Sequence, residues 1–446
     1  MSLPLLHAGG SVDGISAALD LRFASSLSLT STSGLTPSFS RASTGTFFNS
    51  SGVLTTAAIN GPRFNHIYNG SSWVSKGLLV EEQRTNTSTY SEQFDNAAWT
   101  KAGGSISANQ IAAPDGATTA DKFTENSGSS VHYCLGSGGS IANNTICTAS
   151  CFVKKGDRRY VYLTLNDGTA TRLRYTVIFD LDTGTGVNEF SIGSPTDTGY
   201  FIQNFSNGWY KISVKIKTGS SQAYACEMAI GMSDSASPST RDFTNPSYTG
   251  NGSSNFYLWG TQVEAGAFPT SYIPTTTAAV TRSADVCQIT GADLTSILSF
   301  TEGSFAVEFD SLVSNTGALG YGIFSISDSA TNLSRMFFDF YIPDNAYRWY
   351  IRDDGNSGKT TQLKPGPLSD QGVSVKSSMA YKQNDIAISL NSASALTGID
   401  QTIPATLNRL QIGTNDAYAG VWCGHIARLR YYPIRLPNAT LQVLST

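Results

Sequence analysis

The clearest structural signal in the chain is the stretch Tyr210-Lys211-Ile212-Ser213-Val214-Lys215-Ile216-Lys217. Apolar and polar residues alternate along it, and successive side chains of a β-strand point to opposite faces of a sheet. The pattern therefore predicts a half-buried strand whose four apolar side chains face a core, while Lys211, Lys215 and Lys217 face water. The dipeptide Asn207-Gly208 just before it is typical of a hairpin turn.

Similar alternation recurs along the chain, with clusters of Gly, Asn and Asp between the segments. Charged residues make up only 14% of the sequence, against about 25% in an average protein, and the many Gly, Tyr, Phe, Ser and Thr residues disfavour long helices. The sequence predicts an all-β fold of tandem antiparallel β-sandwich (jelly-roll) domains with an extended N-terminal segment. The alternating segments are 160–165, 175–181, 226–232, 256–260, 305–310, 338–342, 347–351 and 386–390.

The length and the proline pattern divide the chain. With 446 residues it exceeds what one hydrophobic core usually organises. Pro269, Pro274 and the run 275–279 mark a boundary, because prolines cannot donate to a strand ladder and the run has no apolar face. We expect three units: an N-terminal segment at 1–89, a jelly roll at 90–280 and a second β-sandwich at 286–446.

Two blocks of the sequence carry a family resemblance. The first contains Arg41-Ala42-Ser43-Thr44, Pro62-Arg63-Phe64 and Gly77-Leu78-Leu79-Val80-Glu81-Glu82-Gln83-Arg84-Thr85-Asn86. The second contains Leu258-Trp259-Gly260 and Glu264-Ala265-Gly266-Ala267-Phe268-Pro269-Thr270-Ser271-Tyr272-Ile273-Pro274-Thr275. Together they resemble virion structural proteins of tailed bacteriophages, of the tail-fibre or surface-decoration type. In that family the first block opens a surface protein, and the second closes a jelly-roll module of the carbohydrate-binding kind.

The end of the chain carries a second resemblance, in shape more than in wording. Residues 420–432, followed by 436–441, resemble the final strand and short closing helix of a concanavalin-like or laminin-G-like jelly roll. The phage-like blocks cover roughly residues 35 to 285, so this last third rests on the shape resemblance alone.

The phage resemblance implies a protein of the virion surface that is assembled in the host cytoplasm. The segment 1–89 would dock on the particle, and the jelly rolls would hold host cell-surface glycan, as in a tail fibre or other attachment protein. The implied partners are other virion proteins, that glycan and further copies of the chain, with a trimer favoured. A capsid (head) decoration or cement protein without sugar binding is the alternative, and a glycan-degrading tailspike is the third reading.

Charge and hydrophobicity argue against two other classes of partner. A net charge of −4 gives no broad basic field for a nucleic-acid backbone. No run reaches the ~18 apolar residues of a membrane span, and residues 1–10 lack the order of a signal peptide, so no membrane insertion is expected. The six cysteines lack the spacing of a disulfide framework, and we expect reduced, buried thiols at Cys134, Cys147, Cys151, Cys226, Cys287 and Cys423.

Residue types that carry catalysis are scattered. The four histidines form no metal-ligand motif, and neither a Gly-x-Ser-x-Gly elbow nor a Walker-type loop occurs. We expect no enzyme, no cofactor and no metal centre, with structural calcium left open at Asp180 and Asp182, which more simply begin a turn. Glycoside hydrolysis needs two carboxylates; Glu308, Asp310 and Asp339 are candidates, although solvated residues on an outer strand face are the preferred interpretation.

Sugar binding needs aromatic faces for stacking and polar side chains for the hydroxyl groups. In the strand at 347–352, alternation sends Arg348, Tyr350 and Arg352 to one face, which we predict to be exposed and to bind glycan. The alternative, that the arginines merely solvate the strand, stays open. Tryptophans beside apolar strands are expected to pack in cores instead; they are Trp99, Trp209, Trp259 and Trp422.

Overall fold

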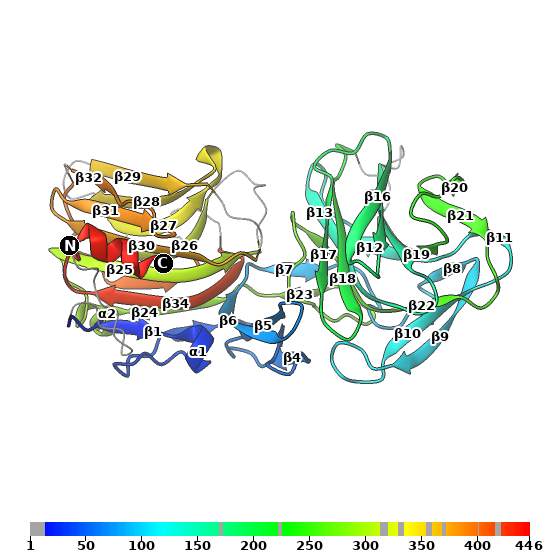
Figure 1. Cartoon of the computed structure of the whole chain (residues 1–446), viewed down its shortest axis with the longest axis horizontal. Coiled ribbons are helices and arrows are strands. Elements are labelled where there is room, and N and C mark those ends of the chain that lie inside the picture. The colour runs from blue at the N-terminus through cyan, green and yellow to red at the C-terminus, as the bar shows by residue number, and fades with distance from the viewer. Residues whose placement is uncertain are drawn as a thin grey trace.

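The structure, a computed structural model, describes residues 14–168, 173–221, 225–312, 320–328, 334–353, 359–367, 372–399, 401–414 and 421–446. Residues 1–10, considered above as a signal sequence, lie outside this part. The described chain forms two β-sandwiches that lie side by side along the long axis of the molecule (Figure 1). The predicted all-β fold of tandem antiparallel sandwiches is confirmed.

The middle sandwich consists of two six-stranded antiparallel sheets around an apolar core. The first sheet runs, in spatial order, through β17 (Gly199–Asn204), β18 (Trp209–Lys217), β13 (Ile146–Lys155), β22 (Asn255–Ala265), β10 (Ala120–Glu125) and β9 (Gly104–Ile111). The second runs through β16 (Thr185–Ile192), β15 (Arg174–Asp180), β14 (Tyr160–Asn166), β19 (Cys226–Ser233), β12 (Tyr133–Gly139) and β8 (Thr100–Ala102). A small sheet contains β11 (Ser129–Val131), β21 (Asn245–Thr249) and β20 (Arg241–Asp242).

The C-terminal sandwich packs an eight-stranded sheet against a seven-stranded one. The larger sheet runs through β32 (Leu396–Gly398), β31 (Ile386–Leu390), β30 (Val375–Lys382), β25 (Glu302–Ser311), β34 (Gly424–Tyr432), β6 (Trp73–Val80) and β5 (Phe64–Tyr68), and β1 (Leu19–Leu21) also pairs with β34. The other runs through β2 (Ser38–Ser40), β24 (Val286–Thr290), β33 (Arg409–Ile412), β26 (Tyr321–Ser327), β27 (Arg335–Tyr341), β28 (Ala346–Asp353) and β29 (Lys359–Gly366).

The N-terminal segment, assigned from sequence to 1–89, shares these sheets in its described part. Leu19 of β1 lies opposite Tyr431, and Val80 of β6 lies opposite Gly424, so both strands extend the larger C-terminal sheet. The segment also forms two short pairings. One is the hairpin of β3 (Gly45–Phe48) with β4 (Leu54–Ala57). The other joins β7 (Arg84–Asn86) to β23 (Val280–Arg282), and Figure 1 labels both of these strands between the two sandwiches.

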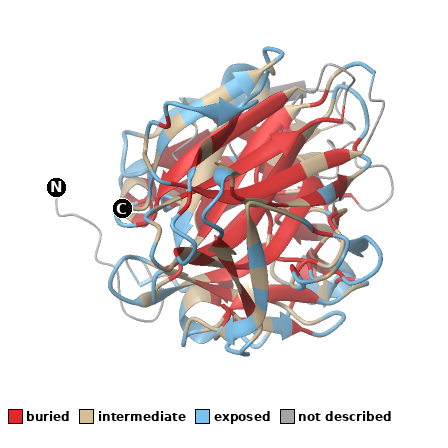
Figure 2. Cartoon of the chain, turned by 90° about the vertical axis from the view of Figure 1, so that its right-hand side faces the viewer, coloured by how far each residue is buried: buried red, intermediate tan, exposed pale blue. Residues whose placement is uncertain are grey.

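Helices in the described residues are few and short. None of them is long and apolar enough to cross a membrane. Buried residues follow the strands and exposed residues follow the connections, as Figure 2 shows. The helices are α1 (Phe23–Ser26), α2 (Gly291–Thr295), α3 (Asn438–Leu444) and the 3-10 turn η1 (Ile342–Asp344).

Alternation along the strands predicts the inward faces correctly. Ile212, Val214 and Ile216 of β18 are fully buried, and the four tryptophans expected in cores are at most 5% exposed. The outward face of β18 differs from the prediction, because Lys211 and Lys215 are only 9% and 8% exposed. Their solvated placement is therefore wrong: other parts of the chain cover this side of the sheet.

Two local predictions are also confirmed. Asn207 and Gly208 both have positive φ, 48° and 77°, as a tight hairpin turn of the predicted type requires. All six cysteines are free and buried. The sandwiches are therefore held together without disulfide bonds in this structure.

A buried network of charged side chains links the N-terminal segment, the linker after β22 and the start of the C-terminal sandwich. Arg63 donates to Glu81 (Nη1–Oε2 2.7 Å) and to Asp285 (Nη2–Oδ2 2.5 Å), and Arg282 donates to the same Glu81 oxygen at 2.6 Å. Ser271 in the linker donates its N–H and its hydroxyl to Glu81 at 2.7 and 2.6 Å. All four charged groups are at most 1% exposed.

The residues of this network lie mostly within the runs that carry the phage-protein resemblance. Arg41 extends it, since its Nη1 donates to Asp285 at 3.0 Å. Asn86 ties the linker to β22, because its Nδ2 donates to the carbonyl oxygens of Thr261 and Ile273 at 2.9 and 2.8 Å. In physical terms, these runs specify the contacts that join the parts of the chain.

Glu81→Gln is expected to lower the free energy of unfolding by about 3–5 kcal/mol at pH 7, because it leaves Arg282 buried without a carboxylate. Burial alone would raise the pKa of Glu81, but Arg282, Arg63 and Ser271 hold it far below the ordinary value. The contribution of Glu81 is therefore complete above the ordinary glutamate pKa and is lost as the pH falls toward the folded-state pKa. Urea unfolding of both proteins between pH 3 and 7 measures this loss of stability. The free energy of unfolding of the variant should fall less steeply than that of the wild type as the pH is lowered.

The matched control is Asp182→Asn, which removes a carboxylate from a pair on the surface, where both partners are well exposed. A cost below about 1 kcal/mol is expected there. Equal costs for the two variants would contradict a structural role for the buried network.

Candidate functional site

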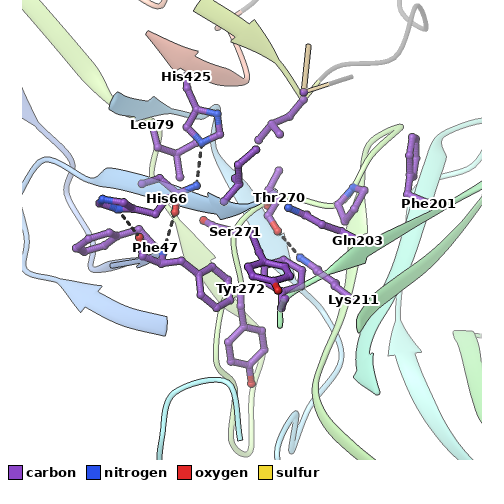
Figure 3. A pocket seen from close by; sticks show the side chains of 18 of the residues that line it. Phe47, His66, Leu79, Phe201, Gln203, Lys211, Thr270, Ser271, Tyr272 and His425 are labelled. Carbon is purple, nitrogen blue, oxygen red and sulfur yellow. Dashed lines mark hydrogen bonds between the residues drawn. The ribbon is translucent and has the colours of Figure 1, made fainter. Parts of the chain in front are cut away.

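A cavity of about 440 Å³ lies between the two sandwiches; we call it the junction cavity. The hairpin β3–β4 and strand β5 supply one wall, and β13, β17 and β18 of the middle sandwich supply the other. Linker residues 269–272 lie between the walls, and the end of β25 and the start of β34 close one side. Figure 3 shows Phe47 and His66 on one side of it, and Phe201, Gln203 and Lys211 on the other.

Aromatic rings form much of the lining. Phe47, Tyr68 and Phe201 line the cavity and are only half-buried, so part of each ring stays accessible. Behind them Phe48 and Phe205 are buried, with ring centroids 4.6 Å apart. These buried rings belong to an apolar cluster in which the hairpin β3–β4 packs on the outer face of the middle sandwich, which fixes the distance between the two walls.

Polar groups face these rings. Glu81 and Ser271 belong to the buried charge network and border the cavity. Lys211 projects from β18, and its Nζ donates to the carbonyl oxygen of Thr270 at 2.7 Å (Figure 3). Ser213, two residues further along β18 and on the same strand face, also lines the cavity and is 1% exposed.

A buried histidine lies at the far end. Asn65 Oδ1 accepts from the N–H of Phe48 at 2.8 Å, which orients the Asn65 amide so that Nδ2 donates to His425 Nε2, also at 2.8 Å. His425 Nδ1 therefore carries the hydrogen and donates to Asp310 Oδ1 at 2.6 Å. The other Asp310 oxygen lies 3.1 Å from Lys76 Nζ. The Nε2 atom of His425 is thus occupied by an amide donor and is not available as a base toward the cavity.

Two carboxylates border the cavity, yet both are locked in the ionised form. Burial alone would raise the pKa of each, but Arg282 and Arg63 hold the pKa of Glu81 well below the ordinary range, and His425 and Lys76 hold that of Asp310 below it. A glycosidase needs one carboxyl group that keeps its proton to act as the general acid. Neither Glu81 nor Asp310 meets this requirement.

A smaller cavity of about 160 Å³ lies on the outer face of the β16–β8 sheet of the middle sandwich. Phe243 stands at its edge with 62% of its surface exposed and a positive φ of 53°. The guanidinium of Arg174 lies 4.7 Å from the centre of this ring, and Asn166 donates to Glu227 at 2.9 Å beside it. An exposed aromatic ring beside polar groups makes this cavity a second place where a sugar could bind.

The residues predicted from sequence to bind glycan lie away from both cavities. Arg348 and Tyr350 are 3% and 7% exposed, so the predicted exposed face is wrong for these two, and Arg352 is half-buried. Arg348 forms two hydrogen bonds with Asp339 on the neighbouring strand, at 3.0 and 2.6 Å, and Tyr350 stacks on Phe337 with ring centroids 4.3 Å apart. Alternation identifies which side chains share a face but not what covers that face. Glycan binding by these three residues stays a prediction.

The acids considered for glycoside hydrolysis are also placed differently. Asp310 and Asp339 are 2% and 0% exposed and ion-paired, so the preferred interpretation of solvated residues is wrong for both, while Glu308 is half-buried. Asp180 binds Arg159 through both oxygens, at 2.8 and 2.6 Å, and precedes a turn that contains Asp182, as predicted. Within the described residues, no group of three or more His, Cys, Asp or Glu side chains could hold a metal ion.

The junction cavity was not predicted from the sequence. Its lining comes from stretches that lie up to 378 positions apart, between Phe47 and His425, and strand alternation does not reveal which sheets come together. One signal was present: Arg63 lies between Pro62 and Phe64, and Glu81 directly follows the apolar run 78–80. Buried polar groups in such places need hydrogen-bonding partners. That signal locates the junction but not the open space beside it.

Arg348→Ala is expected to lower the free energy of unfolding by about 3–5 kcal/mol, because it removes the guanidinium that forms two hydrogen bonds with the buried Asp339 carboxylate. Thermal unfolding followed by circular dichroism measures this, with Arg241→Ala, at an exposed arginine that lies over Phe190, as the control. An unchanged melting temperature for Arg348→Ala would contradict the buried placement and would favour an exposed stripe.

Comparisons with known proteins give structural similarity only. No protein-family model and no curated protein sequence matches the chain. Among solved structures, the CBM40 domain of the Ruminococcus gnavus IT-sialidase bound to α2,3-sialyllactose is 11% identical, with 34% of this chain and 86% of that chain covered and a TM-score of 0.29.

Two further solved structures resemble the chain to a similar degree. Domain 4 of AbnA, a GH43 extracellular arabinanase from Geobacillus stearothermophilus in complex with arabinotriose, is 11% identical over 40% of this chain and 82% of that chain, with a TM-score of 0.29. Domains LG4-5 of the mouse laminin α1 chain are 10% identical over 70% of this chain and 88% of that chain, with a TM-score of 0.24. Similarities this low do not identify what this chain binds.

Proposed function

We propose that this chain is a glycan-binding attachment protein on the surface of a tailed-phage virion, and that the junction cavity holds the sugar. One observation carries the proposal: the cavity sets accessible aromatic rings opposite hydrogen-bonding groups. A pyranose ring has apolar C–H faces that pack on aromatic rings and a rim of hydroxyl groups that need polar partners. Its volume, about 440 Å³, falls within the range of small-ligand sites.

The walls are fixed before any ligand arrives. Glu81, Arg63, Arg282 and Ser271 form a closed set of short hydrogen bonds beside the cavity, and the apolar cluster around Phe48 holds the hairpin β3–β4 on the middle sandwich. A preorganised site loses little free energy to ordering when it binds. This rigidity supports binding of a sugar whose own contacts are few and weak.

Binding without cleavage is part of the proposal. Neighbouring groups hold the pKa values of Glu81 and Asp310 low, so neither carboxyl group keeps a proton to act as the general acid, and His425 Nε2 is engaged by Asn65. This supports attachment over a degrading tailspike, and a decoration protein without sugar binding would leave the cavity without a role.

The phage part of the proposal rests on the two sequence blocks, which map onto the contacts that join the sandwiches. We extend it to display of several copies per particle, as a homo-oligomer, with trimers favoured and with other virion proteins as neighbours. Weak binding at each site is then sufficient, because copies on one particle raise the effective concentration at the host surface.

Phe201→Ala is expected to weaken binding of the intact chain to polysaccharide from the host surface about fivefold or more, because it removes one accessible stacking ring from the cavity. A glycan array identifies the polysaccharide that wild-type protein binds, and titration calorimetry then measures both proteins against it. The melting temperature is expected to change little, since Phe201 is only half-buried.

Phe243→Ala is the matched control, since it removes an accessible aromatic ring from the smaller cavity. Affinity unchanged by Phe243→Ala but lowered by Phe201→Ala supports the junction cavity. The reverse result would move the sugar to the smaller cavity, and no binding of wild-type protein to any host polysaccharide would contradict attachment through glycan.

A further inference from the structure

One cation at the junction has no carboxylate partner. The buried cationic side chains that gather there are Arg41, Arg63, Arg84, Lys211 and Arg282, and the buried carboxylates among them are Glu81, Glu264 and Asp285. Each arginine has a carboxylate partner: Arg41, Arg63 and Arg282 pair with Glu81 or Asp285 at 3.0 Å or less, and Arg84 pairs with Glu82. In the described part of the chain, Lys211 forms no ion pair within 4 Å. Its Nζ donates to the carbonyl oxygen of Thr270 and lies 5.7 Å from the centre of the Phe152 ring.

Glu264, the remaining buried carboxylate, does not form an ion pair with Lys211. Glu264 accepts at Oε1 from the N–H of Thr270 (2.8 Å) and from Gln262 Nε2 (2.7 Å), and at Oε2 from the Thr270 hydroxyl (2.7 Å). Glu264 therefore holds the linker at Thr270. Burial lowers the pKa of Lys211, because the ammonium group has lost water that nothing around it fully replaces.

A second polar group beside this lysine also lacks a partner. Ser213 lies two residues along β18 on the same face, lines the same cavity, and its Oγ has no hydrogen-bond partner among the described residues. Buried side-chain hydroxyl groups nearly always have one. A buried ammonium with spare protons and an unsatisfied hydroxyl thus lie side by side on one wall, and both are groups that can donate to an anion.

We infer that the junction cavity is selective for an acidic sugar, whose carboxylate accepts hydrogen bonds from Lys211 and Ser213 while its ring packs on the aromatic side chains opposite. The inference rests on the proposed function and adds the class of sugar. A neutral sugar could fill the same space but would leave the extra positive charge buried and uncompensated, which is unfavourable. A carboxylate from the ligand gives Lys211 the direct ion-pair partner that the described residues do not supply.

The anionic side chains of the cavity do not oppose this charge. Glu81 is surrounded by Arg63, Arg282 and Ser271. Asp310 pairs with Lys76 and accepts a hydrogen bond from His425, so both carboxylates already have a cationic partner. The charge that remains accessible for pairing inside the cavity is that of Lys211.

The test uses the full-length protein and an array of bacterial surface polysaccharides, each presented intact and after chemical reduction of its carboxyl groups to primary alcohols. Reduction keeps the sugar ring and its hydroxyl groups but removes the charge. We expect wild-type protein to bind carboxylated polysaccharides and to lose about tenfold or more in affinity on their reduction, the size of a charge-assisted hydrogen bond.

Lys211→Met should weaken binding to the intact acidic polysaccharide to a similar extent and should make binding insensitive to reduction. Ser213→Ala should weaken it less, since it removes a neutral donor. Lys215→Met is the matched control: Lys215 lies on the same face of the same strand and is equally buried, but does not line the cavity, so it should keep both affinity and sensitivity.

The outcomes distinguish selectivity for acidic sugars from the proposed glycan binding on which it rests. Wild-type binding that is unchanged by carboxyl reduction, or that is confined to neutral polysaccharides, would overturn selectivity for acidic sugars and leave glycan attachment standing. Loss of sensitivity in Lys215→Met but not in Lys211→Met would also overturn it. Because the reduction experiment uses wild-type protein, it gives an answer even if Lys211→Met does not fold.

Discussion

The structure depends on a set of buried ion pairs at the point where its parts meet. Arg63 binds Glu81 from the N-terminal segment and Asp285 from the start of the C-terminal sandwich, and Ser271 from the linker binds the same Glu81. Burying charges costs several kcal/mol per ion unless each finds a partner with good geometry. The charged members of the network lie in the N-terminal segment, the linker and the start of the C-terminal sandwich, so their pairing fixes how these three stretches meet.

This constraint explains what could be predicted from the sequence and what could not. Alternation in strands such as β18 identifies Ile212 and Val214 as core residues, because an apolar side chain needs only some apolar neighbours. The opposite face is a different matter. The sequence predicts that Lys211 is solvated and that Arg348 is exposed. In the structure, Lys211 donates to the linker carbonyl of Thr270, and Arg348 pairs with Asp339. Alternation with a period of two residues does not reveal what covers a sheet.

The candidate site lay beyond prediction for the same reason. The cavity exists because the hairpin β3–β4 crosses from the N-terminal segment onto the middle sandwich, where Phe48 packs on Phe205. The local sequence of residues 45–57 does not predict that contact. The phage-like runs give the best indication of the junction, since a polar residue such as Glu81 directly after an apolar run indicates a buried contact. Such residues specify how the parts of the chain join. They do not specify the cavity beside the junction.

The polar groups at the junction divide into two kinds, and the division bears on function. Glu81, Asp285 and Asn86 have their hydrogen-bonding capacity largely used, as expected of groups that hold a structure together. Lys211 and Ser213, on the wall of the cavity, do not. The inferred selectivity for an acidic sugar gives these two groups a ligand carboxylate as acceptor, because a buried donor whose hydrogen-bonding capacity is not used is unfavourable. The rigid network beside them holds the cavity walls in place before a ligand binds.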